Sequence, residues 1–295
     1  MLIARRLQRT IAATAEVQGI GFIFGSDVRL RFKPADADTG VVFVRVDLPG
    51  RPSVRAHVHN VIPSQRRTTI RDGAAVVEMI EHVMAALAGL RIDNCEIEID
   101  APDTPGCDGS SLTFTQALQA AGAVTLDRPR LALLIERSFT VRDGSAVLTA
   151  RPGAGDGFVS TYHLDYGPAS PIVAQSLTLD LNPTSFAEEL APCRTFLLQS
   201  EAEALREAGI GLRTTTADLL IFGPDGVVGN TLRFADECAR HKMLDLVGDL
   251  ALLEMDVIGE VEANRSGHTL NAALAHALVA TLSARDNPDA GSHAA

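Results

Sequence analysis

The residues most capable of chemistry lie four apart in one helix-like segment near the end of the chain. The segment reads ADECARHKMLDLVGDLALLEM, and it contains His241, Asp245 and Asp249 at that spacing. Residues four apart share one face of an α-helix. A His and a carboxylate on one face can bind the same divalent cation, and a His from elsewhere would complete three protein ligands with one position left for water. That is the coordination of a catalytic zinc site, although the same pair also occurs as a solvated ion pair.

Two other segments hold ionisable residues that such a site could use. VVEMIEHVMAALAGL contains the pair Glu81-His82, and RSGH ends in His268 at a predicted turn from strand to helix. Neither signal is specific by itself. A buried, hydrogen-bonded His82 and a helix N-terminal His268 without a catalytic task are both ordinary alternatives.

Strands and helices in the first half of the chain must position the first of these segments. VRLRFKPA and GVVFVRVDL, within residues 5–60, alternate apolar and polar residues as strands do. A short strand and a turn containing glycine are predicted at RRTTIRDGAAVV. Apolar residues at helical spacing predict a helix over residues 74–90, which would place Glu78 on the same face as His82. CEIEIDA is a predicted strand, and SLTFTQALQAAG is a predicted helix that Gly122 stops.

The second half repeats this order of strands followed by helices. The strand pattern resumes after TLDRPR, which predicts a domain boundary near residues 125–130. Strands are predicted at FVSTYHLDY, SLTLDL, DLLIFGP and VIGEVEANRSG, and helices at residues 199–208, 235–254 and HTLNAALAHALVATLSA. Segregated strands and helices indicate the α+β class. We expect domains at residues 1–126 and 127–284, and a disordered tail at residues 285–295.

Composition limits the classes of function. The 295 residues carry a net charge of −11, are 46% hydrophobic and only 4% aromatic, and include no Trp. An acidic chain that is poor in aromatic residues is a poor candidate for nucleic-acid binding. The four cysteines form no C-x-x-C pair and are interpreted as reduced thiols of a cytosolic protein. No run of eighteen apolar residues and no signal peptide are found, so we expect a cytoplasmic protein without a membrane span.

A series of motifs runs through most of the chain, namely VEMIEH with AALAGLRIDN, PGCDGSS, CRTF, LRFADECARHKMLDLVGDL and RSGHTLN. In these motifs and in their order, the chain resembles the UDP-3-O-acyl-N-acetylglucosamine deacetylase family, the zinc enzymes of lipid A biosynthesis. HKMLD and SGH are the most specific parts of the resemblance. It implies two similar α+β domains, each a β-sheet with two helices. Their helix layers would pack together between the sheets, with the active site between the domains.

The resemblance implies one Zn²⁺ per chain, bound by His82, His241 and Asp245. Imidazole and carboxylate are suitable zinc ligands, and a bound water becomes a usable nucleophile. By the same resemblance, Glu81 is the general base that takes a proton from this water. Glu78 is the competing candidate. We prefer Glu81 because the family has Glu immediately before the ligand His.

The remaining catalytic roles are also implied by the resemblance. His268 would stabilise the oxyanion and protonate the leaving amine, and Asp249 would hold it charged. Thr195 would donate a hydrogen bond to the oxyanion, and Phe196 would pack on the sugar or acyl portion.

Two basic residues and several apolar ones complete the predicted site. Lys242 is either a solvated helix residue or a catalytic and phosphate-binding one, and Arg265 is predicted to meet the same phosphates. A passage for the acyl chain is predicted between CRTF and LRF. Its predicted apolar surface comes from Leu197, Leu198, Ile210 and Leu212.

The predicted reaction is removal of acetyl from the 2-nitrogen of a UDP-linked, 3-O-acylated glucosamine. We expect a monomer that meets this lipid-like substrate by transient contact with the inner membrane face. Two loops depart from the family. Residues 19–25 read GIGFIFG where Gly-x-Gly-Leu-His-Ser-Gly is usual, and RTT at residues 213–215 replaces Gly-Gly-Ser. We expect these departures to bear on the acyl-chain length and on the recognition of the sugar.

Two alternative functions follow. The altered loops favour a zinc amidohydrolase that acts on a different N-acylated amino sugar. The other alternative is an inactive substrate-binding paralogue, against which the intact set of Glu81, His82, His241, Asp245 and His268 argues.

Overall fold

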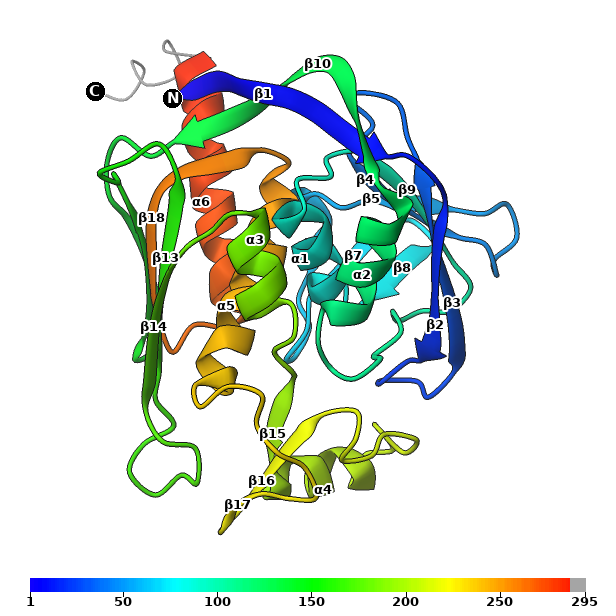
Figure 1. Ribbon diagram of the computed structural model, residues 1–295, viewed down its shortest axis with the longest axis vertical. Helices are drawn as coiled ribbons and strands as arrows, with labels where there is room; N and C mark the ends of the chain where they lie inside the picture. Colours follow the sequence, from blue (N-terminus) through cyan, green and yellow to red (C-terminus); the bar gives the residue numbers. More distant parts are fainter. Residues whose placement is uncertain (287–295) are drawn as a thin grey trace, which may run out of the picture.

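Two β-sheets face each other across a layer of helices in the computed structural model, which describes residues 1–286 (Figure 1). The N-terminal half supplies α1 (Glu81–Gly89) and α2 (Leu112–Ala121), and the C-terminal half supplies α5 (Glu237–Leu250) and α6 (His268–Asp286). These helices lie between the sheets, so the expected α+β arrangement with packed helix layers is confirmed.

The N-terminal sheet covers the helices α1 and α2. Its buried residues alternate along β3, where Val28, Leu30 and Phe32 face the core, as expected for strands with one buried face. Its strand order is β2 (Ala15–Ile20), β3 (Asp27–Pro34), β9 (Cys95–Ile99), β4 (Val41–Arg45) and β5 (Ser53–Arg55). A smaller sheet in this half contains β6 (Val61–Ile62), β7 (Thr69–Asp72) and β8 (Ala75–Glu78).

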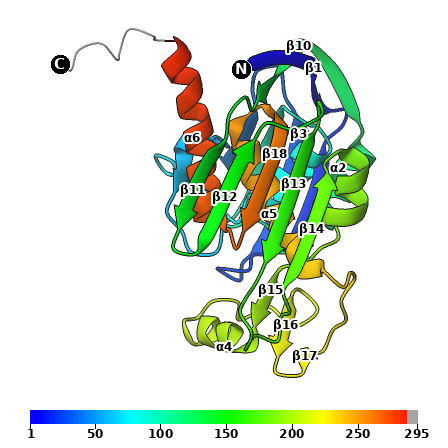
Figure 2. The same ribbon diagram turned by 90° about the vertical axis from the view of Figure 1, so that its left-hand side faces the viewer.

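The C-terminal sheet is organised around β18 (Asp256–Asn264), which delivers the chain to His268. β18 pairs in parallel with β10 and β13 and antiparallel with β12. Figure 2 shows these strands side by side. The remaining strands extend the sheet at its edges. The bounds are β1 (Leu2–Ile11), β10 (Ala123–Leu134), β11 (Phe139–Asp143), β12 (Ala146–Arg151), β13 (Phe158–Leu164) and β14 (Gln175–Asp180).

The boundary that the sequence suggested near residues 125–130 falls inside β10. β10 pairs antiparallel with β1 along nearly its whole length, so the first strand of the chain is attached to the C-terminal sheet. The Arg6 guanidinium joins the halves, because it contacts Asp93 at 2.6 Å and Asp256 at 2.8 Å. The two halves are therefore connected by a long β-ribbon and by a partly buried ion-pair network.

A small subdomain projects from the C-terminal half (Figure 1). It contains β15 (Phe196–Leu198), α4 (Gln199–Glu207), β16 (Leu220–Gly223) and β17 (Gly226–Val227). It follows two short helical pieces, α3 (Pro183–Ser185) and the π-helical turn Phe186–Leu190.

The predicted helix over residues 74–90 was wrong in its first turns. Residues Ala75–Glu78 form β8, and the helix begins only at Glu81. The break lies at Met79, whose φ of 58° is left-handed and cannot continue an α-helix. Glu78 consequently lies on a strand and does not share a helix face with His82.

Of the predicted tail at residues 285–295, the part after Asp286 lies outside the described residues. Within residues 1–286, no helix has the length and apolar character needed to cross a membrane.

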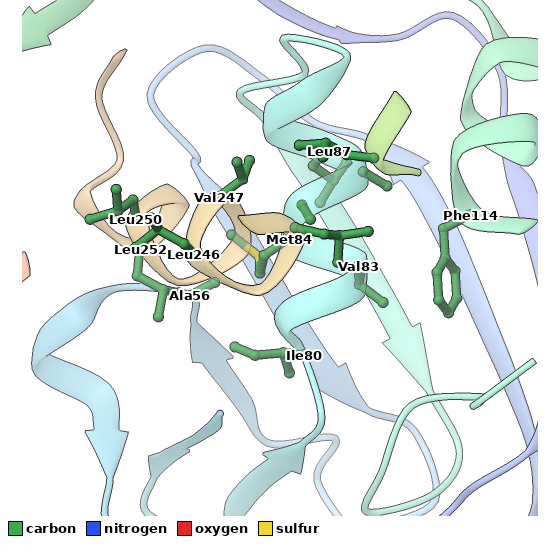
Figure 3. Close-up of a cluster of buried hydrophobic side chains, with 14 of the residues drawn as sticks. Ala56, Ile80, Val83, Met84, Leu87, Phe114, Leu246, Val247, Leu250 and Leu252 are labelled. Atoms are coloured by element: carbon green, nitrogen blue, oxygen red, sulfur yellow. The ribbon is translucent and has the colours of Figure 1, made fainter. Parts of the chain in front are cut away.

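The two halves meet where α1 packs against α5. Figure 3 shows Met84 and Leu87 of α1 close to Leu246 and Val247 of α5. Gly248 permits the close contact, because a Cβ atom at this position would lie 2.1 Å from the backbone oxygen of Glu81. The helices can therefore approach only while residue 248 lacks a side chain.

We expect Gly248→Ala to destabilise the fold by about 1–3 kcal/mol, the usual cost of overpacking a close-packed interior. The clash is with backbone atoms, so rotation of a side chain cannot relieve it. Chemical denaturation measures the free energy of unfolding. Gly155→Ala is the control, since the nearest atom to its new Cβ would be 3.9 Å away. Equal stability of the two variants would contradict the tight helix crossing.

Candidate active site

Three side chains from α1 and α5 converge at the helix crossing. His82 lies on α1, and His241 and Asp245 lie one turn apart on α5. Asp245 Oδ1 is 3.5 Å from Nε2 of each His, and the three candidate ligand atoms lie within 4.8 Å of one another. Asp245 Oδ1 is also buried without a hydrogen-bond partner. A buried carboxylate oxygen is costly when unpaired, so this geometry and donor set fit a metal ion.

His241 is held ready to act as a ligand through its Nε2 atom. Its Nδ1 lies 3.1 Å from the carbonyl oxygen of Cys193, which favours a proton on Nδ1 and leaves Nε2 free. Burial lowers the pKa of His241 to about 3, although Asp245 opposes this shift. The imidazole is therefore neutral at physiological pH, as metal binding requires.

Lys242 balances the charge of Asp245. Its ammonium donates to Asp245 Oδ2 at 2.7 Å, so the two oxygens of Asp245 have different environments. Burial opposes ionisation of Asp245, yet the charges of Lys242 and His268 hold its pKa well below the usual range. Lys242 is partly buried, which by itself would lower its pKa, but the Asp245 carboxylate raises that pKa. Both groups are charged in the folded protein.

Glu81 and Glu78 have different environments. Glu81 is only 2% exposed, and its Oε2 accepts a hydrogen bond from the backbone N–H of Thr68 at 3.0 Å. Burial raises the pKa of Glu81, partly offset by His268 and His82. A carboxylate with raised proton affinity next to a metal ligand can serve as a base near neutral pH. Glu78 instead pairs with Arg67 outside the set of residues that line the site.

His268 and Asp249 form a partly buried pair on the C-terminal side of the site. The Nδ1 atom of His268 lies 2.9 Å from Asp249 Oδ2. Thr68 donates its hydroxyl to the other oxygen of Asp249, and Asn271 donates its amide to Oδ2 at 2.8 Å. Burial by itself would lower the pKa of His268, but Asp249 and Asp245 together raise it to about 9. His268 therefore carries a proton at neutral pH.

The CRTF segment crosses the site between the two halves. The Thr195 hydroxyl donates to the Gly109 carbonyl at 3.0 Å, and Thr195 lines the cavity. The Phe196 ring is 7% exposed and lies edge-on to His241, with 6.0 Å between ring centroids. A buried ion pair between Arg194 and Glu237, at 2.8 Å, ties this segment to the start of α5. The segment therefore positions Thr195 and the His241 ring together.

A cavity of about 450 Å³ opens over these residues. Glu81, His82, His241, Asp245 and His268 all line it. Its lining also includes basic and aromatic side chains that can meet an anionic ligand. They are Arg66, Tyr166, Lys242 and Arg265.

A second cavity of about 180 Å³ lies under the subdomain and is mainly apolar. Leu197 and Ile210 line it, as the sequence suggested for the acyl passage, but Leu198 and Leu212 do not. Leu212 is 68% exposed. Leu198 instead precedes α4, where its backbone N–H donates to Glu201.

Three contributors were missed by sequence reasoning. Thr68 contacts Glu81, Asp249 and His268, yet it lies in a strand-like stretch without a motif. The carbonyl of Cys193 and the side chain of Asn271 were also missed. Asn271 follows His268 by three residues, so its helical spacing could have indicated it.

The chain is similar to a known family over nearly its whole length. The family described as UDP-3-O-acyl N-acetylglycosamine deacetylase matches residues 8–280. Curated relatives named UDP-3-O-acyl-N-acetylglucosamine deacetylase include a protein from Bdellovibrio bacteriovorus, 40% identical over 89% of this chain and 86% of the relative. Those from Citrifermentans bemidjiense and Pseudomonas entomophila are 38% and 37% identical, over 93% and 94% of this chain and 88% and 91% of the relatives.

In metal-free protein, NMR titration of the imidazole signals should give His268 a pKa of about 9. Asp249→Asn should lower this pKa by roughly one to three pH units, because the variant removes the nearest opposite charge while burial persists. The variant His268 then loses its proton at a lower pH than the wild type. Asp165→Asn, which removes a carboxylate paired with Arg265, is the control. A His268 that titrates equally in both variants would show that Asp249 does not hold its proton.

Proposed function

The chain belongs to the UDP-3-O-acyl-N-acetylglucosamine deacetylase family, and on this premise we propose that it removes acetyl from the 2-nitrogen of UDP-3-O-acyl-N-acetylglucosamine in lipid A biosynthesis. One observation carries the proposal. Three candidate metal ligands, a carboxylate of raised proton affinity and a protonated His converge in one cavity between the two halves. This arrangement also argues against a substrate-binding paralogue, which would not need the acid–base pair.

Zinc is the ion proposed for the His82, His241 and Asp245 set. Two neutral imidazoles and one carboxylate are a common catalytic zinc ligand set. When bound, the ion would lower the pKa of a water molecule and polarise the amide carbonyl. Lys242 would keep Asp245 oriented and ionised through its other oxygen.

Glu81 is proposed as the general base. In its ionised form the carboxylate can take the proton of the attacking water, and its raised pKa favours acceptance of that proton near neutral pH. The Thr68 backbone N–H holds Oε2, which fixes the direction of the carboxylate.

His268 is proposed as the general acid. Asp249 engages its Nδ1, so the Nε2–H remains for the substrate. The protonated ring can stabilise negative charge on the oxygen of the amide and then donate a proton to the departing amine. Thr68 and Asn271 hold Asp249 in place for this task.

Thr195 and the basic residues are proposed to bind the remaining parts of the substrate. The Thr195 hydroxyl, which donates to the Gly109 carbonyl, would donate instead to the oxyanion as it forms. Lys242 would place its positive charge beside the reacting centre, because the Lys242 ammonium is hydrogen-bonded to Asp245. Arg265, with 39% of its side chain exposed, would meet the diphosphate. Phe196 would support the sugar from the His241 side.

The apolar cavity is proposed to hold the 3-O-acyl chain. It adjoins the reaction cavity, because Arg66, Met79, Thr195 and Leu197 line both. A chain attached to the 3-oxygen of the sugar could thus run from one cavity into the other.

The enzyme is proposed to act in the cytoplasm, where the free thiols of Cys95, Cys107, Cys193 and Cys238 are compatible with reducing conditions. A monomeric state and transient contact with the inner membrane face stay predictions from the resemblance.

One zinc ion should bind per chain, and His82→Ala and His241→Ala should each lose most of it, because each variant removes one of three protein ligands. Elemental analysis of purified protein measures the ratio. His163→Ala is the control, since this His contacts Ser176 and Glu262 away from the site. Full zinc retention in both ligand variants would refute the ligand set.

Glu81→Ala should lower kcat/KM for acetate release from the acylated UDP-sugar by about two to four orders of magnitude, the usual contribution of a positioned proton-transfer group. Zinc content should remain unchanged, since Glu81 is not a proposed ligand. Glu78→Ala is the matched control and should retain most activity, because Glu78 pairs with Arg67. A crippled Glu78 variant beside a nearly normal Glu81 variant would reverse the assignment.

A further inference from the structure

We propose that Asp108 and Arg233 are positioning residues for Thr195, because their ion pair holds the Gly109 carbonyl on which Thr195 rests. The inference rests on the proposed function, in which the Thr195 hydroxyl donates to the oxyanion. None of the proposed catalytic roles uses a side chain of PGCDGSS, the segment at residues 105–111 that contains Asp108 and Gly109.

Thr195 is held on the Gly109 carbonyl by two donors. Its backbone N–H donates to this oxygen at 2.7 Å, and its hydroxyl donates to the same oxygen at 3.0 Å. The carbonyl of Thr195 accepts from the backbone N–H of Leu220 at 2.9 Å, which holds the residue from its other side. When the hydroxyl turns to the oxyanion, the N–H can keep its bond to Gly109. The place of the Gly109 carbonyl therefore sets the place from which the hydroxyl acts.

Gly109 lies in a turn that only glycine fits. Its φ of +78° is left-handed, and a Cβ atom there would lie 2.6 Å from the carbonyl oxygen of Asp218. Its N–H donates to the Gly106 carbonyl at 2.9 Å. Ser111, which is 0% exposed, donates its hydroxyl to the His82 carbonyl at 2.7 Å. The segment therefore contacts α1, which carries a proposed metal ligand, as well as the segment that carries Thr195.

The Asp108 carboxylate fixes this turn through both of its oxygens. Oδ1 accepts from the backbone N–H of Ser110 at 3.1 Å and from its hydroxyl at 2.6 Å. Oδ2 accepts from Nη2 of Arg233 at 2.7 Å. Burial by itself would raise the pKa of Asp108, but the hydrogen bonds from Ser110 and Arg233 lower it, so the carboxylate is ionised. One oxygen thus acts within the turn and the other acts across the interface between the halves.

Arg233 connects the turn to the segment that carries Thr195. While Nη2 binds Asp108, Nη1 donates to the carbonyl of Pro192 at 2.7 Å. Pro192 lies three residues before Thr195, so one planar guanidinium fixes the spacing between this segment and the Gly109 turn. The side chains of Arg233 and Asp108 are 35% and 28% exposed, so their ion pair contributes little to overall stability. Its effect should therefore be on geometry.

Amide hydrogen exchange, followed by NMR, tests the positioning without any substrate. Asp108→Asn keeps the shape of the side chain but removes its charge, so it weakens the contact with Arg233. The Thr195 amide should then exchange on the order of tenfold faster than in the wild type, because its acceptor Gly109 is less firmly held. Arg233→Gln should have the same effect and serves where Asp108→Asn folds poorly.

The second measurement is kcat and KM for acetate release from the acylated UDP-sugar, with zinc content measured for each variant. Asp108→Asn and Arg233→Gln should each lower kcat on the order of tenfold and leave KM nearly unchanged, because a displaced donor weakens only the contact with the oxyanion. Thr195→Val should lower kcat by about two to three orders of magnitude. In the Thr195→Val background, Asp108→Asn should change kcat by no more than about twofold, since no hydroxyl is left to position.

Asp27→Asn is the matched control. Asp27 also accepts from an Arg across the halves, at 3.0 Å from Arg213, but it lines neither the reaction cavity nor the apolar cavity. The exchange of the Thr195 amide and the value of kcat should both match those of the wild type in this variant.

The outcomes separate the two proposals. An unchanged exchange rate of the Thr195 amide in Asp108→Asn and Arg233→Gln would show that the ion pair does not hold Thr195. Equal losses of kcat on Asp108→Asn with and without the Thr195 hydroxyl would show that the pair acts on the whole site and not through Thr195. A wild type that releases no acetate from the acylated UDP-sugar would instead refute the proposed function, and the exchange measurement would still decide whether Asp108 and Arg233 position Thr195.

Discussion

The close crossing of α1 and α5 is the constraint on which the rest of the structure depends. α1 carries Glu81 and His82, and α5 carries His241 and Asp245, so the separation of these helices sets the geometry of the candidate metal site. Gly248 makes this separation possible because the Glu81 backbone occupies the place of its missing side chain. Next to this contact, apolar side chains of α1 and α5 form a shared core between the two sheets. The site is therefore only as rigid as this interface between the halves.

Buried charges in the site are tolerated because they are paired in a specific pattern. Lys242 neutralises one oxygen of Asp245, and His268 neutralises Asp249. Breaking either pair would leave a buried charge without compensation, which is strongly unfavourable. Burial raises the pKa of Glu81, whose Oε2 accepts a hydrogen bond from a neutral backbone N–H. Burial would lower the pKa of His268, but the charges of Asp249 and Asp245 outweigh burial and raise it. The same fold thereby places a carboxylate of raised proton affinity and a protonated imidazole in one cavity.

The two cavities depend on less extensive contacts than the candidate metal site. The subdomain containing β15, α4, β16 and β17 reaches the N-terminal half through individual side chains, among them Arg66 to Glu201 at 2.7 Å and Arg213 to the turn at residues 21–25. Loops held by a few such contacts can change without disturbing the helix crossing. The contacts that hold the apolar cavity are therefore separate from those that hold the helix crossing.

The sequence by itself determined what is local. The spacing of four residues on α5, the alternation in the strands and the Gly122 stop of α2 are periodic or positional signals, and the structure confirms these elements. Only the tertiary structure decided which distant groups meet. Met79 adopts a left-handed backbone conformation, which glycine adopts most readily. Because no glycine stands there, the sequence did not indicate that α1 begins only at Glu81 or that Glu78 lies on a strand. Thr68 and the Cys193 carbonyl likewise join the site through packing, because hydrogen bonds between residues far apart in the chain leave no periodic trace in the sequence.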